Sequence, residues 1–283
     1  MSLLISGGLR LAQTYTQQPY MWEFPQQYGL WYPGLISTAL WLDAADASTV
    51  TTVSGGVSQW SDKSGNARNF TQSTAGRRPT YTASALNGRS AVTPDGSNDW
   101  LTGPVVFSGT TPDDYFIIAA IKILNIIDAS GNAANGLFYQ TGSLLLNSNV
   151  YFNLAQTPDY KVLTDLYPPT GGSLSSTTAT QANTSYIFAA SRTSGTRAIW
   201  INGSTDVSQS AAETYTGDAI VATDLFMLRG TNNALNAHVG EIIALPYPST
   251  LNRQKIEGYL AHKWGLTASL PIDHPYKTVG PTP

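Results

Sequence analysis

The chain has 283 residues, of which 42% are hydrophobic and only 12% are charged, with a formal net charge of −3 and no cysteine. The densest basic spot is the pair Arg77-Arg78, which excludes nucleic-acid binding through clustered phosphate contacts, and the lack of cysteine excludes disulfides and thiol catalysis. The apolar part of the N-terminus is too short for a signal peptide and no apolar run could span a bilayer, so we expect a soluble chain without membrane insertion.

Residues 1–36 differ from the rest, because aromatic residues alternate irregularly with glutamine and proline, and the prolines prevent a regular helix or central strand. Burying an aromatic side chain contributes roughly 1.5–3 kcal/mol, so we expect this arm to pack on something. Either it covers the sandwich of its own chain, or it docks on a neighbouring subunit. The aromatic residues predicted to anchor it are Tyr15, Tyr20, Trp22, Phe24, Tyr28, Trp31 and Tyr32.

Residues 37–248 are typical of strands joined by tight turns, because short apolar runs alternate with Asp, Asn, Gly and Ser. The run from Tyr115 to Ile123 is almost continuously apolar and predicts a central strand. Residues 186–192 and 198–201 predict a hairpin, and residues 167–184, rich in Pro, Gly, Ser and Thr, predict a surface loop.

The last element is a helix over 250–264, which Ser249 or Thr250 can cap and Gly265 can end. We expect it to lie across one edge or end of the sandwich. Its apolar stripe is predicted from spacing near 3.6 residues: Leu251, Ile256, Tyr259, Leu260 and Trp264.

Several segments, in this order, resemble concanavalin A-like, laminin-G-type jelly-roll domains of phage and bacterial surface proteins. They cover roughly residues 38–277 and include WLDAAD, QWSDKSGNARNF, RRPTY, LNGRSAV, DGSNDWL, FAASR, IWINGS, HVGEIIAL, RQKIEGYLAHKWGL and SLPIDHPYK. The resemblance implies an all-β fold: an antiparallel jelly-roll β-sandwich over residues 37–283, with one C-terminal helix and the irregular N-terminal arm over 1–36. One departure is Pro94, where the family commonly has an aromatic residue; it puts the local strand pairing in question.

An oxygen-rich cluster of Asp95, Asn98 and Asp99 is the candidate calcium site, because calcium binds six to eight oxygen ligands. The same residues are also the ordinary residues of tight turns, and this interpretation is favoured. The same ambiguity applies to Asp43, Asp46 and Asp62. No cofactor is therefore predicted beyond this calcium candidate.

No catalytic pattern is recognised, so we expect the chain not to be an enzyme. Glycoside hydrolysis needs two carboxylates held across a sugar, and jelly-roll glucanases carry them as E-x-D-x-x-E on one strand. That run is absent, and Glu241 is a lone carboxylate on a predicted strand, expected to be a hydrogen-bonded partner near the rim. The three histidines are too far apart in sequence to indicate a metal site.

Three tryptophans could stack on sugars or fill the core. For Trp60 and Trp200 we predict the core. Trp100 borders a turn and is the candidate glycan contact.

Taken with the resemblance, these features favour a non-enzymatic structural protein of a phage virion, either a capsid decoration (cement) or head-fibre protein anchored by its arm. Such a protein would assemble in the cytoplasm of the host bacterium, form a homo-oligomer and contact other virion proteins, either the major capsid protein or tail proteins. The alternative is a glycan-binding, lectin-like module of a receptor-binding or tail protein, or of a bacterial adhesin, whose partner would be a cell-surface glycan.

Overall fold

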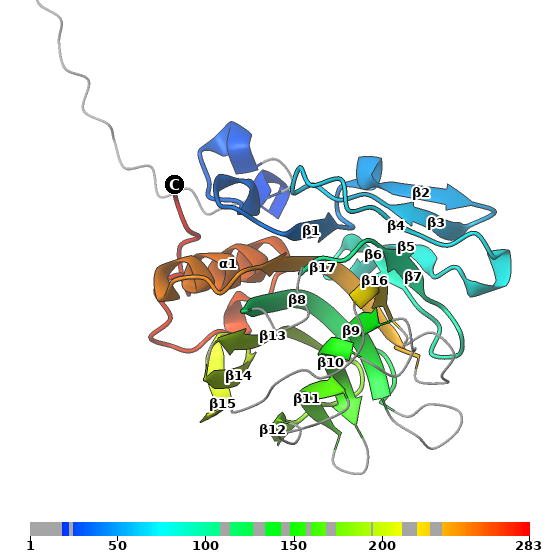
Figure 1. Ribbon diagram of the computed structural model, residues 1–283. Helices are drawn as coiled ribbons and strands as arrows, with labels where there is room; N and C mark the ends of the chain where they lie inside the picture. Colours follow the sequence, from blue (N-terminus) through cyan, green and yellow to red (C-terminus); the bar gives the residue numbers. More distant parts are fainter. Residues whose placement is uncertain are drawn as a thin grey trace, which may run out of the picture.

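The computed structural model describes residues 19–22, 25–107, 114–126, 134–142, 148–156, 160–167, 174–193, 195–210, 220–226 and 234–283. Over these residues the chain is an antiparallel β-sandwich with one C-terminal α-helix, which confirms the predicted fold class (Figure 1). No helix in this part of the chain is long and apolar enough to cross a membrane.

The first sheet carries the long apolar strand of the sequence at its centre. Its strands, in spatial order, are β1 (Leu40–Asp43), β17 (Ala237–Leu245), β8 (Tyr115–Ile123), β13 (Thr184–Thr193), β14 (Thr196–Ile201) and β15 (Ser204–Ser210). The hairpin predicted for residues 186–201 is thus β13–β14. Asn202 and Gly203, both with positive φ, form the tight turn into β15.

The second sheet combines short strands from the early part of the chain with longer strands that follow later in the sequence. Its strands, in spatial order, are β2 (Val50–Val53), β3 (Gly56–Trp60), β4 (Phe70–Thr71), β7 (Leu101–Gly103), β16 (Ile220–Leu225), β9 (Ala134–Gly142), β10 (Ser148–Gln156), β11 (Lys161–Tyr167) and β12 (Leu174–Ala179). A hairpin of β5 (Thr80–Leu86) and β6 (Arg89–Thr93) joins the sheets, because β5 pairs with β3 and β6 with β17. Strand β6 ends directly before Pro94.

The edge of the second sheet differs from the expectation. Residues 167–184 were expected to be a surface loop, but β12 lies inside this range and pairs with β11. Polar strands on a sandwich edge resemble loops in sequence, because their exposed side chains are Ser and Thr. Trp60 and Trp200 are buried, as predicted for core residues.

Strand β8 is apolar except at Lys122, because both of its faces are covered. Ile117, Ala119 and Ile121 face a core between the two sheets, whereas Phe116 and Ile118 face a second core on the outer side of the first sheet. That outer core is closed by helix α1 (Thr250–Lys263) and by the N-terminal segment. The pattern follows from the period-two alternation of a strand with two buried faces.

Helix α1 begins as predicted: the Ser249 side chain accepts a hydrogen bond from the backbone N–H of Asn252, and Gly265 follows the helix with φ +66°. The helix covers the outer face of the first sheet, not an edge or end as expected (Figure 1). Leu251 was predicted in the apolar stripe but is 56% exposed, since it lies in the first turn, before the helix meets the sheet.

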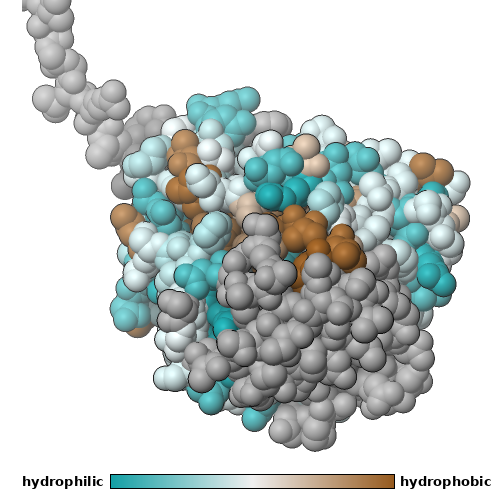
Figure 2. All heavy atoms as spheres, viewed as in Figure 1, coloured by the Kyte–Doolittle hydropathy of each residue, from teal (hydrophilic) through white to brown (hydrophobic). Residues whose placement is uncertain are grey.

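Over its described residues, 19–22 and 25–36, the arm is irregular and contains the short 3-10 helices η1 (Pro19–Trp22), η2 (Pro25–Tyr28) and η3 (Pro33–Leu35). The other 3-10 helices in the described part of the chain are η4 (Ala47–Thr49), η5 (Ala75–Arg77) and η6 (Thr267–Ser269). The C-terminal tail ties the arm down, because the backbone N–H of Trp31 donates to the carbonyl of Pro281 at 3.0 Å. On the face shown in Figure 2, the described residues are mainly hydrophilic or intermediate in hydropathy, in teal or white, with apolar patches in brown.

Candidate functional site

The site begins with two carboxylates that the sheet places side by side. Asp43, the last residue of β1, is the register partner of Glu241 on β17. Both side chains are buried and point to the outer face, beneath helix α1, because the alternate residues Leu42 and Ile242 face the core between the sheets. Like charges directly opposite each other destabilise a sheet, so this pair needs a counter-charge.

Lys263, in the last turn of α1, supplies that charge. Its ammonium lies 2.7 Å from Asp43 Oδ1, 2.8 Å from Glu241 Oε2 and 3.0 Å from the hydroxyl of Tyr259. Three acceptors therefore match the three donors of a lysine ammonium. Lysine is almost never fully buried unless it is paired, and Lys263 is only 2% exposed.

Glu241 also fixes three aromatic side chains. Its carboxylate accepts hydrogen bonds from Trp41 Nε1 at 2.6 Å, from Trp264 Nε1 at 2.8 Å and from the Tyr259 hydroxyl at 2.9 Å. Gly240 makes room for this arrangement, since a Cβ there would lie 2.7 Å from the Trp264 ring. One carboxylate thus holds β1, β17 and α1 together.

The two carboxylates differ in their proton affinity. Burial alone would raise the pKa of Asp43, but Lys263 and Lys63 outweigh it and hold that pKa below its usual value of 3.8. Burial raises the pKa of Glu241, with Lys263 offsetting only part of the effect and Asp43 adding to it. Burial and the neighbouring Glu241 also raise the pKa of Tyr259 well above its usual value. Asp43, which also lines the cavity, is therefore the more acidic of these two carboxylates.

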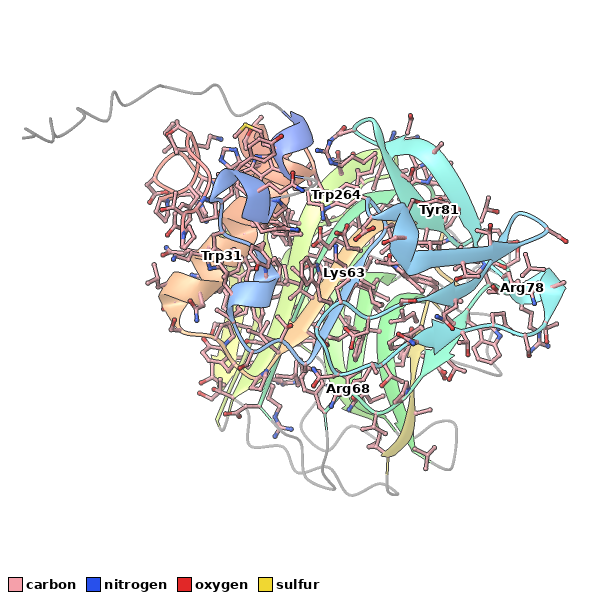
Figure 3. All side chains as sticks on the ribbon, turned by 90° about the horizontal axis from the view of Figure 1, so that it is seen from above. Trp31, Lys63, Arg68, Arg78, Tyr81 and Trp264 are labelled. Atoms are coloured by element: carbon pink, nitrogen blue, oxygen red, sulfur yellow. The ribbon has the colours of Figure 1, made fainter. Side chains whose placement is uncertain are left out.

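Lys63 extends the network outward from Asp43. Its ammonium lies 2.9 Å from Asp43 Oδ2, 2.8 Å from Asp46 Oδ2 and 4.5 Å from the centre of the Trp41 ring. Asp46 caps η4 and accepts hydrogen bonds from the backbone N–H and the hydroxyl of Ser48. Seen from above, Lys63 lies near the middle of the molecule (Figure 3).

The turn that carries Lys63 is built by Asp62. Its carboxylate accepts the backbone N–H groups of Trp41, Ser64 and Arg68, at 3.0, 2.9 and 3.0 Å. This confirms the turn interpretation of Asp62, and it explains why the DKSGN segment places the Lys63 side chain over Trp41.

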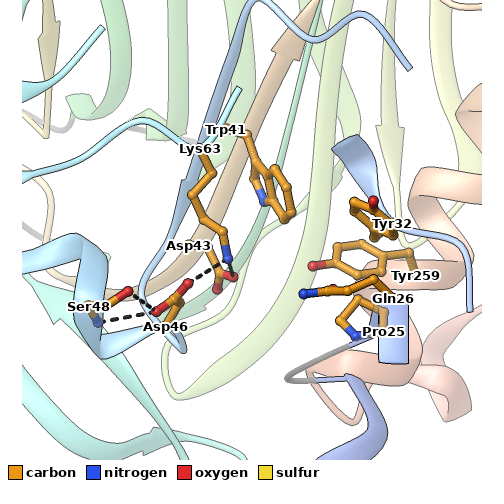
Figure 4. A pocket seen from close by; sticks show the side chains of 9 residues that line it. All are labelled: Pro25, Gln26, Tyr32, Trp41, Asp43, Asp46, Ser48, Lys63 and Tyr259. Carbon is orange, nitrogen blue, oxygen red and sulfur yellow. Dashed lines mark hydrogen bonds and ion pairs between the residues drawn. The ribbon is translucent and has the colours of Figure 1, made fainter. Parts of the chain in front are cut away.

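A cavity of about 340 Å³ opens above this network. Figure 4 shows Lys63 and the two aspartates on one side, and Tyr259 with the arm residues on the opposite side. The lining residues come from the arm, β1, η4, the Asp62 turn and α1: Pro25, Gln26, Tyr32, Trp41, Asp43, Asp46, Ser48, Lys63 and Tyr259.

The lining combines aromatic rings with charged side chains that are fixed in place. Aromatic rings stand beside a few fixed polar groups, which is the usual composition of a small-molecule site. Both lining carboxylates have a pKa held below the usual value; for Asp46 burial opposes this, and Lys63 and Ser48 outweigh it. An acid that donates a proton near neutral pH needs a raised pKa instead.

The predicted anchoring residues fall in different places. Tyr15, Phe24 and the side chain of Tyr20 lie outside the described part of the chain. Trp22 and Trp31 are buried against α1, with their rings 5.9 and 6.1 Å from that of Tyr259. Tyr28 is exposed. Tyr32 lines the cavity and lies 6.2 Å from the Trp41 ring.

The predicted calcium cluster forms a turn. Asp95 accepts the backbone N–H groups of Ser97 and Asn98 at 2.8 and 3.3 Å, while Asp99 accepts that of Asp95 at 3.0 Å. Burial, and then the charge of Asp95, raise the pKa of Asp99 to about 6. Within the described ranges, no three acidic, histidine or cysteine side chains gather as a metal site requires.

Trp100, the predicted glycan contact, is half-buried and lies outside the cavity lining. Its backbone N–H donates to the carbonyl of Arg77, and its carbonyl accepts a hydrogen bond from the side-chain amide of Gln72. The structure therefore does not bring Trp100 together with the aspartates of β1 and η4.

Lys63 and Lys263 were not predicted as site residues from the sequence, in which Asp43, Asp46 and Glu241 were candidates only singly. Glu241 was expected near the rim, but it is fully buried at the centre of the network. The sequence of the helix did contain one signal. Lys263 follows Tyr259 by four residues and directly precedes Trp264, so it lies on the buried side of the helix and requires a buried acidic partner. Which acid it meets depends on the register of β1 with β17.

No family model matches this chain, and no curated protein matches its sequence. Solved structures do match its fold. Domain 4 of an extracellular GH43 arabinanase from Geobacillus stearothermophilus, in complex with arabinotriose, aligns with a TM-score of 0.55 and 12% identity over 81% of this chain and 98% of that one.

Two further structures are similar. The receptor binding domain of botulinum neurotoxin D aligns with a TM-score of 0.53 and 11% identity, over 78% of this chain and 52% of that one. A GH54 α-L-arabinofuranosidase soaked with a cyclic sulfate inhibitor aligns with a TM-score of 0.53 and 13% identity, over 82% of this chain and 60% of that one. The chain thus spans little more than half the length of these two. At such identities the likeness establishes a shared β-sandwich fold.

Proposed function

We propose that this chain is a non-catalytic saccharide-binding module, and that the cavity between the arm, β1 and α1 is its binding site. The observation that carries the proposal is the lining itself: the Tyr32 and Trp41 rings line the same cavity as the Lys63 ammonium and the Asp46 carboxylate. A sugar presents an apolar face and a rim of hydroxyls, which match rings and fixed polar groups in the same site.

The fold supports this proposal at a coarse level. Among similar structures are a domain in complex with arabinotriose and a receptor binding domain, and this chain spans nearly the whole of the former. Fold alone is a weak guide to function, so the proposal rests on the cavity.

The test is a glycan array with the purified chain, followed by titration calorimetry with arabinotriose and with any glycan the array retains. Tyr32→Ala should weaken binding at least tenfold, because it removes one ring of the cavity. The matched control is Tyr247→Ala, an exposed tyrosine outside the lining. Loss on Trp100→Ala but not on Tyr32→Ala would move the site to Trp100, and no binding to any saccharide would refute the function.

As a second proposal, the chain is a structural protein of a phage virion, as the resemblance in its sequence implies. What supports it in the structure is that the arm turns Tyr28 and Leu35 to solvent, 45% and 46% exposed, while Trp22 and Trp31 hold the arm on its own chain. Tyr28→Ala with Leu35→Ala should then reduce incorporation into particles without unfolding the sandwich. Undiminished copy number in purified particles would contradict an anchoring role for these two residues.

A further inference from the structure

The donors of Lys63 are arranged so that one of them remains for a ligand. Its ammonium has three N–H groups. Two are directed to Asp43 Oδ2 and Asp46 Oδ2, at 2.9 and 2.8 Å, and the ammonium is held over the Trp41 ring. The side chain is 22% exposed and lines the cavity. Lys63 therefore offers a donor whose position is fixed from three sides.

Asp46 offers an acceptor next to that donor. Its Oδ1 receives the N–H and hydroxyl of Ser48, and its Oδ2 receives Lys63. A carboxylate has about four lone-pair positions, so one remains on Oδ2. The Asp46 side chain is 33% exposed against 3% for Asp43, so it is the carboxylate that a ligand reaches. A fixed donor beside a fixed acceptor suits two neighbouring hydroxyls, one accepting and one donating.

The charges of the lining decide which saccharides can enter. When the groups ion-paired to the lining residues are included, the carboxylates of Asp43, Asp46 and Glu241 face the two ammonium groups of Lys63 and Lys263, which leaves one net negative charge. Asp43 and Asp46 stay ionised because their pKa values are lowered. Burial would lower the pKa of Lys63, but the two aspartates outweigh it and raise that pKa. An anionic sugar meets like charge there, and like-charge juxtaposition is a strong device against wrong partners.

A cationic ligand is disfavoured for a different reason. Lys63 already occupies the place that a cation would take, between two carboxylates and above the Trp41 ring. A second cation would have to displace it.

We infer that, if the proposed function holds, the cavity selects uncharged saccharides and rejects uronic and sialic acids. Two neighbouring hydroxyls of the saccharide form hydrogen bonds with Asp46 and Lys63. Asp46 is then the specificity-determining residue. Trp41 and Tyr32 provide the apolar contact, and Lys263 acts through Asp43, Glu241 and Tyr259.

The experiment compares the full chain on an array that carries neutral glycans beside their uronic or sialylated counterparts. The wild-type chain should bind neutral glycans at least tenfold more tightly than acidic ones. Asp46→Asn keeps an acceptor and removes the charge, so it should reduce this ratio at least tenfold. Asp273→Asn, at an exposed aspartate outside the lining, should leave the ratio unchanged.

A second measurement needs no variant. Raising the salt concentration screens charge repulsion between ligand and cavity, so it should strengthen binding of acidic glycans to the wild-type chain and leave neutral ones unaffected. Equal binding of neutral and acidic glycans by the wild-type chain would overturn this inference while the proposed function stands. No binding of any glycan by a folded chain would refute both.

Discussion

The two faces of the first sheet are both buried, but by different kinds of side chain. Between the sheets, strands β1, β8 and β17 contribute apolar side chains such as Leu42, Ala119 and Ile242, the last two being register partners. On the outer face the same strands contribute Asp43 and Glu241 among their apolar residues. The apolar cluster between the sheets depends on shape and buried area, whereas the outer layer needs a lysine of α1 to neutralise what it buries.

This contrast shows where such a fold can carry a site. The cluster between the two sheets is closed on both sides, so its residues pack on one another. The outer layer is covered by a helix and an irregular arm that leave a cavity over Trp41 and Asp43. Charge buried beneath that cover also orients the groups that line the cavity.

The strongest loss of stability is expected from removing the counter-charge. Lys263→Met would leave Asp43 and Glu241 facing each other in the outer layer, and removing one partner of a buried ion pair costs about 3–5 kcal/mol. Urea denaturation would measure this loss in the free energy of unfolding. Lys255→Met, on the same helix, removes one hydrogen bond to the Thr282 carbonyl and should cost about 1 kcal/mol or less.

A triple variant extends the same test. Asp43→Asn, Glu241→Gln and Lys263→Met together remove all three charges, so the triple variant should recover much of the stability that Lys263→Met loses. If Lys263→Met alone costs no more than the Lys255→Met control, the outer layer does not depend on charge pairing and the contrast between the two faces disappears.

A smaller effect is expected at Gly240. An added Cβ would lie 2.7 Å from the Trp264 ring and would displace it from Glu241, so Gly240→Ala should destabilise the fold by about 1–3 kcal/mol. The control is Gly76→Ala, where the added Cβ meets no atom within 4 Å. Thermal unfolding followed by tryptophan fluorescence would compare the two, and equal midpoints would show that Trp264 can move without loss.

The weakest effect concerns Asp99, a buried carboxylate near the carboxylate of Asp95 and away from the outer layer of the first sheet. Burial and then Asp95 raise the pKa of Asp99 from 3.8 to about 6, so its contribution to stability is fully present below pH 3.8 and is lost as the pH rises through about 6. Asp99→Asn should therefore remove a decline in the urea midpoint between about pH 4 and pH 6.

Asp206 provides the opposite case. Burial opposes the effect, but hydrogen bonds from Thr178 and Thr177 hold its pKa below 3.8. Its contribution is therefore present above pH 3.8 and is lost as the pH falls through the lowered value. Asp206→Asn should leave the decline assigned to Asp99 in place. A wild-type midpoint that is flat over this range would contradict that assignment.

Much of the fold could be predicted because it follows from local pattern. The apolar run 115–123 predicted a central strand, Asn202-Gly203 a tight turn, and Ser249 with Gly265 the two ends of the helix. These features depend on neighbours within a few residues, so the sequence carries them directly. The predicted position of the helix was wrong, because nothing local says which face of a sheet it covers.

The candidate site could not be predicted in the same way. Asp43 and Glu241 lie far apart in the chain, and they become neighbours only through the pairing of β1 with β17. Lys63 reaches Asp43 because the turn at Asp62 folds back on Trp41. Strands, turns and one helix follow from the period of apolar residues and from turn chemistry, so they could be read along the chain. Which charges meet follows from the folded pairing of the strands, because a one-residue change of register would turn each carboxylate to the opposite face of the sheet.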